Sequence, residues 1–95
     1  MPLTLTDKVR SDLHIRSNSN DLLISETIDT AKMRMRMMGV QLVSDADPTT
    51  VQCIKLYCRF YFNFQGEADR YFRAFEYMAN AMAESGDYRK PEEGR

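Results

Sequence analysis

The sequence contains few of the residues from which catalytic and metal sites are usually built. Its 95 residues include one histidine, His14, and no tryptophan. No cysteine, histidine or carboxylate stands at a metal-ligand spacing from His14, so we expect a surface or partly buried imidazole. The four glycines are scattered singly, and no Glu-x-x-His pair is present, which argues against a phosphate loop and against a di-metal bundle site. We therefore predict no enzyme, no cofactor and no metal.

The two cysteines, Cys53 and Cys58, are five residues apart. On one helix they point in directions roughly 140° apart, so they can neither form a disulfide nor share a metal. We expect two buried, reduced thiols, as in cytoplasmic proteins.

Long apolar runs and an excess of charge are also missing. No run approaches the roughly 18 apolar residues of a membrane span, and the first residues lack the basic and apolar regions of a signal peptide. The formal net charge is −1, which gives no electrostatic reason to expect nucleic acid or a membrane surface as the main partner.

What is present is helical periodicity in a composition typical of one globular domain, with 43% apolar and 28% charged residues. We predict an all-α, four-helix bundle over residues 1–86 and a flexible tail over residues 87–95. The first helix is expected to begin at Thr6 as its N-cap. The second is expected from Asn20 to Met38, with Gly39 after it.

The third and fourth helices are expected at 48–64 and 67–85. Asp47 followed by Pro48 is a typical helix start. Within residues 48–64, the polar side chains form one narrow strip and nearly all the others are apolar. This pattern predicts a central helix covered by several neighbours. The polar strip is Gln52, Lys55, Arg59 and Asn63. The buried stripe of the fourth helix is expected to be Ala68, Tyr71, Phe72, Phe75, Met78, Ala79 and Met82.

The second helix has apolar residues on two sides. Ile24, Ile28, Ala31, Met35 and Met38 form one stripe at helical spacing. Leu22, Met33 and Met37 fall on roughly the opposite side, where a monomer needs no apolar residue. Flexible methionines suit adaptable interfaces, so the surplus indicates self-association.

Lys32, Arg34 and Arg36 alternate with methionines at the end of this helix. Lys32 and Arg36 share a side, whereas Arg34 points elsewhere. Solvated charges favoured by the helix dipole are the first interpretation. Contact with an acidic patch of a neighbouring subunit and direct DNA contact are the alternatives.

The order of these segments resembles the small helical head–tail connector family of tailed phages and prophages, also called adaptor or head-completion proteins. The resemblance covers roughly residues 3 to 89. Its matching segments are residues 5–9, 13–15 and 21–24, the helix through Ile28, Ala31 and Lys32 to Gly39, Asp47-Pro48, and residues 54–57, 66–71 and 85–89.

The resemblance implies a structural protein of the virion head–tail junction, made in the cytoplasm of a bacterial host. Such subunits form a homo-oligomeric ring of about a dozen copies. The ring docks on the portal at the DNA exit of the capsid, in a family also named for DNA packaging, and it carries a stopper or tail-completion protein. DNA passes through the channel without specific binding, and no membrane is involved.

Within this hypothesis, the candidates for contacts between subunits are Leu22, Met33, Met37, Phe60 and Phe64. Family members dock a C-terminal segment against the portal, which makes Tyr88, Arg89 and Lys90 the candidates for portal docking. A small helical DNA-binding regulator that uses Lys32, Arg34 and Arg36 is the alternative function, and a small helical enzyme or metal-dependent bundle is a third.

Overall fold

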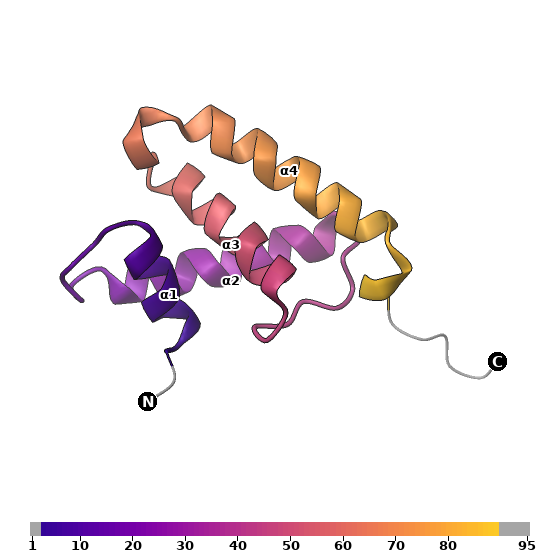
Figure 1. The fold of residues 1–95 in the computed structure, drawn as a ribbon, viewed down its shortest axis with the longest axis horizontal. Coiled ribbons are helices and arrows are strands. Elements are labelled where there is room, and N and C mark those ends of the chain that lie inside the picture. The colour runs from indigo at the N-terminus through magenta and orange to yellow at the C-terminus, as the bar shows by residue number, and fades with distance from the viewer. Residues whose placement is uncertain (1–2, 90–95) are drawn as a thin grey trace.

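The computed structural model describes residues 3–89, and this part of the chain is all-α, as the sequence predicts (Figure 1). Four α-helices and two short 3-10 turns follow one another, and residues 3–89 contain no strand. The elements are α1 (Leu5–Asp12), α2 (Asp21–Met37), α3 (Pro48–Tyr61), η1 (Phe64–Gly66), α4 (Ala68–Glu84) and η2 (Gly86–Tyr88).

Side-chain caps set the starts of α1 and α3. The predicted cap Thr6 is wrong, because Thr4 occupies this position and α1 begins at Leu5. The Thr4 hydroxyl accepts a hydrogen bond from the backbone of Asp7, whose carboxylate accepts one from the backbone of Thr4, both at 3.1 Å. This reciprocal capping box satisfies two backbone donors at once. The predicted cap Asp47 is confirmed, since its carboxylate accepts from the backbone N–H of Thr50 at 2.9 Å.

Residues with positive φ angles follow the C-terminal ends of α2 and α3. Gly39 follows α2 at φ 107°, a conformation that glycine adopts without strain. A Cβ there would also stand 3.3 Å from the Cβ of Ala83 in α4. The third helix stops at Tyr61, three residues earlier than predicted, because Asn63 and Gln65 are left-handed at φ 48° and 54°. The η1 turn then reverses the chain into α4.

The third helix is the centre of the fold, as its apolar circumference predicts. It packs against α1, α2 and α4, and Figure 1 shows it lying between the two long helices α2 and α4. Cys53, Ile54 and Cys58 are fully buried. The predicted inner stripe of α2 is confirmed at Ile24, Ile28, Ala31 and Met35, which are buried, and at Met38, which is half-buried.

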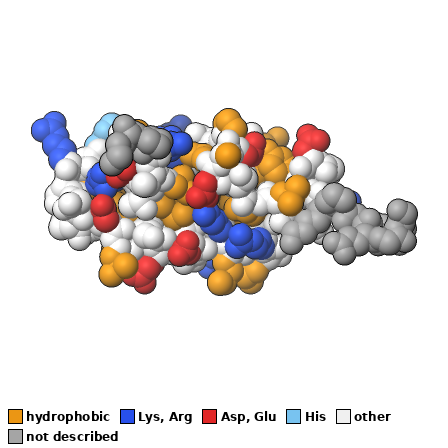
Figure 2. Space-filling view, turned by 90° about the horizontal axis from the view of Figure 1, so that it is seen from below, with side chains coloured by type: hydrophobic (Ala, Val, Ile, Leu, Met, Phe, Trp, Pro, Cys, Tyr) orange, Lys and Arg blue, Asp and Glu red, His pale blue; other side chains and the backbone are white. Residues whose placement is uncertain are grey.

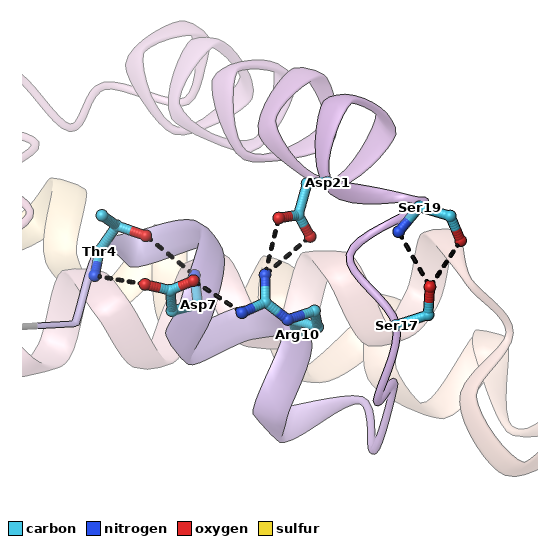
Figure 3. A network of polar contacts seen from close by, with 6 residues as sticks. All are labelled: Thr4, Asp7, Arg10, Ser17, Ser19 and Asp21. Carbon is cyan, nitrogen blue, oxygen red and sulfur yellow. Dashed lines mark hydrogen bonds and ion pairs between the residues drawn. The ribbon is translucent and has the colours of Figure 1, made fainter.

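Charged side chains attach α1 to α2. Figure 3 shows the guanidinium of Arg10 between two carboxylates. One of its nitrogens donates to both oxygens of Asp21 at 2.7 and 2.8 Å, and the other donates to Asp7 at 2.7 Å. In the connection between the helices, Ser17 bonds to Ser19 through hydroxyl and backbone contacts of 3.0 and 3.1 Å. Asp7 therefore links the capping box of α1 to Arg10, the residue that makes the contact with α2.

A second arginine attaches α1 to α3. Arg59 donates to both oxygens of Asp12 at 2.7 and 2.8 Å, a bidentate geometry. The same guanidinium lies 5.5 Å from the ring centroid of Phe64 and 5.3 Å from that of Tyr71. The hydrogen bonds to Asp12 raise the pKa of Arg59. Arg59 belongs to the polar strip predicted for α3, and α1 and these rings partly cover it.

The chain after α4 remains part of the helical unit through residue 89. Tyr88 is half-buried against the core, and its carbonyl accepts hydrogen bonds from the backbone of Gln41 and Leu42 at 3.0 and 2.9 Å. Its hydroxyl donates to Asp47 at 2.8 Å. The boundary expected at residue 86 therefore does not mark where contacts with the domain end, because Tyr88 closes over the connection between α2 and α3.

Truncating a buried and an exposed aromatic side chain of α4 tests which of the two contributes to stability. Phe75 is 1% exposed and its ring packs against Tyr57 and Phe72, whereas Tyr77 on the same helix is 80% exposed. We expect Phe75→Ala to lower the free energy of unfolding by about 3–5 kcal/mol, because it leaves a cavity. Tyr77→Ala should change it by less than about 0.5 kcal/mol. Urea titration followed by circular dichroism measures both, and equal effects would contradict this core assignment.

Candidate interaction surface

Three large apolar side chains are exposed on the outer side of α2. Leu22, Met33 and Met37 are 75%, 61% and 80% exposed, on the side of α2 opposite its buried stripe. Single exposed apolar residues are common, but several on one helix face indicate a binding surface. Figure 2 shows one side of the molecule, where apolar side chains reach the surface in separate groups beside acidic and basic ones.

Charges on the outer side of α2 are divided by sign along the helix. Glu26 and Asp29 are exposed in its N-terminal half, and Arg36 is exposed in its last turn. None of these three forms an ion pair with any residue in the range 3–89. A cation in the last turn is favoured by the helix dipole, whereas the carboxylates gain little from it so far from the first turn. The outer face therefore has an acidic half and a basic half.

The three predicted cations lie in three different environments. Lys32 forms an ion pair with Asp45 of the following loop at 2.7 Å. The guanidinium carbon of Arg34 lies 6.0 Å from the ring centroid of Tyr57. Arg36 is exposed. The alternation in the sequence thus distributes the cations around α2, and they do not form one basic patch.

Phe60 and Phe64 lie in an aromatic cluster instead of standing free on the surface. Both are half-buried. The ring centroid of Phe60 is 4.6 Å from that of Phe72 and 5.5 Å from that of Tyr57. The ring of Phe64 packs against Tyr71 at 6.1 Å and against His14. These contacts leave each ring only part of its surface for a partner, so Leu22, Met33 and Met37 are the more accessible candidates.

The groups with potential reactivity are not assembled into a site. His14 is exposed at the end of α1, 5.6 Å from the ring of Phe64. Cys53 and Cys58 are buried and unbridged, as predicted. Burial raises the pKa of each thiol to about 12, and the nearby Asp12 carboxylate adds to the effect on Cys58. No group of three or more potential metal ligands occurs among the described residues.

A cleft of about 260 Å³ lies between α2 and α4. Its lining residues are Arg34, Met37, Met38, Phe72, Phe75 and Glu76. The volume is below the usual 300–1,000 Å³ of small-molecule sites. Four of its six lining residues are apolar, and the other two are the cation Arg34 and the carboxylate Glu76.

The three portal-docking candidates differ in accessibility. Arg89 is exposed, Tyr88 is half-buried in the contact with Asp47, and Lys90 lies outside the described residues. Sequence reasoning did not find the pairing of Tyr88 with Asp47, which are 41 residues apart. It also did not find the exposed ring of Tyr77, although its place outside the buried stripe of α4 was a signal.

Comparisons with protein families, curated proteins and solved structures give no match to this chain. None of the helices within residues 3–89 is both long and apolar enough to cross a membrane. The interaction surface must therefore be interpreted from its own geometry.

The burial of the two cysteines predicts their reactivity. With a thiol pKa of about 12 and no access to solvent, neither Cys53 nor Cys58 should react with a maleimide or with Ellman's reagent at pH 8 in the folded protein. Both should react at once in 6–8 M urea, where the chain is unfolded. Rapid labelling of either thiol without denaturant would contradict the packing of α3.

The contact between Asp47 and Tyr88 predicts a pH dependence. The Thr50 backbone N–H lowers the pKa of Asp47 most, followed by the Tyr88 hydroxyl and the Thr50 hydroxyl. A lowered folded-state pKa gives stability that is present above the unfolded value near ~3.9 and is lost as pH falls through the folded value. Asp47→Asn should therefore lose less stability than the wild type between pH 5 and pH 2 in urea titrations. Identical pH profiles would contradict this.

Proposed function

We propose that the protein is a structural connector subunit that works by contacting copies of itself and a portal-type ring, without chemistry of its own. The observation that carries the proposal is the outer face of α2, where Leu22, Met33 and Met37 are exposed on a helix whose opposite stripe fills the core. A monomer does not need these exposed apolar side chains. The potentially reactive groups of residues 3–89 supply no competing candidate site.

The resemblance of the sequence to head–tail connectors gives the proposal its biological setting. In that setting, copies form a homo-oligomeric ring of about a dozen subunits on the portal at the head–tail junction. A stopper or tail-completion protein binds to the ring, and DNA passes through it. The net charge of −1 suits a channel through which DNA slides without being held.

The contacts of Tyr88 bear on which C-terminal residues could dock on the portal. A tail that becomes ordered on the portal was expected from residue 87 onwards. Because Tyr88 is bonded to Asp47 and to the backbone of Gln41 and Leu42, docking through this residue would first require breaking these contacts. Arg89 is exposed and offers its guanidinium without any such rearrangement.

A DNA-binding regulator is less well supported. It requires several cations on one face to neutralise phosphates. Lys32 is paired with Asp45, and Arg34 lies on the flank of α2 beside Tyr57. Duplex binding that weakens steeply with salt would favour the regulator over the connector.

Electron microscopy of the protein mixed with its own portal tests the proposed function. We expect rings of the protein on the portal, and Met33→Asp combined with Met37→Asp should abolish the rings while the helical circular dichroism spectrum is retained. The control is Tyr77→Asp, which places one such carboxylate on α4 at a position as exposed as Met37. Failure of the wild type to bind the portal under assembly conditions would overturn the proposal.

A further inference from the structure

One flank of the outer face of α2 has a charge pattern that specifies how two copies can meet. Asp29 and Arg36 are seven residues apart, so they lie on the same flank about 10 Å apart along the axis. Met33 lies between them and is 61% exposed. Neither charged side chain forms an ion pair with another residue in the range 3–89, and both are exposed.

The orientation of the second copy follows from this order. Two copies of α2 packed in parallel and in register would place Asp29 against Asp29 and Arg36 against Arg36, which is repulsive. Two antiparallel copies centred near Met33 place each Asp29 opposite the Arg36 of the other copy. In a two-fold contact of this kind the Asp29–Arg36 pair occurs twice, because Asp29 of each copy faces Arg36 of the other. Matching of opposite charges sets the register of such contacts.

We infer that the outer face of α2 pairs with the same face of a second copy, antiparallel and two-fold symmetric. Met33 packs on Met33 at the centre of this contact, and two Asp29–Arg36 pairs flank it. The methionine side chains supply adaptable apolar contact.

The size of the surface predicts a weak complex. Two antiparallel copies of α2 centred at Met33 overlap over residues 29–37, about 14 Å along the axis. A contact of this length covers less than the roughly 800 Å² per partner of a standard interface. We expect association in about the micromolar range that weakens as salt screens the charge pairs.

The pair also has a place in assembly. A two-fold contact centred at Met33 covers Met33 and Met37, so a ring that uses these two residues forms only after the pair opens. The pair is therefore a storage form of the subunit, in which the apolar face is covered until the portal is available. This role rests on the proposed function, whereas the pairing itself does not depend on it.

Charge exchange tests the pairing in sedimentation equilibrium experiments without portal. Asp29→Arg alone and Arg36→Asp alone should each lower the association constant at least about tenfold, because like charges then meet twice. The variant with both changes should associate like the wild type to within about threefold. An equimolar mixture of the two single variants should form mixed pairs. In such a pair the two cations of one variant face the two carboxylates of the other.

Two variants on other surfaces serve as matched controls. Glu84→Arg changes the net charge as Asp29→Arg does, and Arg73→Asp changes it as Arg36→Asp does, both at exposed positions of α4. Neither control should alter association. Circular dichroism establishes that every variant is folded.

Cross-linking tests the register. Met33→Cys should form a disulfide-linked dimer under mild oxidation, because the two copies of this residue meet at the two-fold axis. Leu22→Cys is the control, since Leu22 is even more exposed, at 75%, but lies near the end of the face. Cys53 and Cys58 are buried and do not compete in the folded protein.

The outcomes separate this inference from the proposed function. A wild type that stays monomeric at all concentrations, a double exchange that does not restore association, or equal cross-linking at residues 22 and 33 would overturn the pairing. If the wild type is monomeric but Met33→Asp weakens portal binding, the portal covers this face and the pairing is again wrong. Pairing without portal binding would overturn the proposed function alone.

Discussion

The fold depends on the burial of α3, whose apolar surface is larger than any one neighbouring helix can cover. Pro48–Tyr61 carries buried side chains over most of its circumference, and α1, α2 and α4 all pack against it. Apolar burial is the main driving force of folding, so the remaining helices are arranged around α3. The bidentate contact of Arg59 with Asp12 then attaches the short helix α1. Such a helix of eight residues would have little stability alone.

The two sides of α2 have different environments. Its inner stripe, from Ile24 to Met35, is needed for the core. Its outer face keeps Met33 and Met37 in solvent, although exposed apolar area is not favourable for an isolated subunit. The charges along that face make its two ends different, since the carboxylates precede the cation along the helix. A surface with both features specifies an orientation for its partner, whereas apolar area alone would not.

The polar and potentially reactive side chains of residues 3–89 have mainly structural contacts. The thiols are buried with raised pKa values, and His14 stands at the end of α1 with an aromatic ring as its neighbour. General acid–base and nucleophilic catalysis require such groups within hydrogen-bond distance of one another. The polar networks that do exist, around Arg10, Arg59 and Asp47, join helices and loops to one another.

The sequence alone determined the four helices, the inner stripe of α2, the central place of α3 and the exposure of Leu22, Met33 and Met37, because these follow from local periodicity and caps. The tertiary structure decided what depends on contacts between distant residues. It placed Arg59 under α1, Phe60 and Phe64 in an aromatic cluster, and Tyr88 on Asp47. Left-handed residues shortened α3, and Thr4 replaced Thr6 as the cap of α1. Helical spacing gives the direction of a side chain from its own helix axis, but only packing fixes which other segment meets it there.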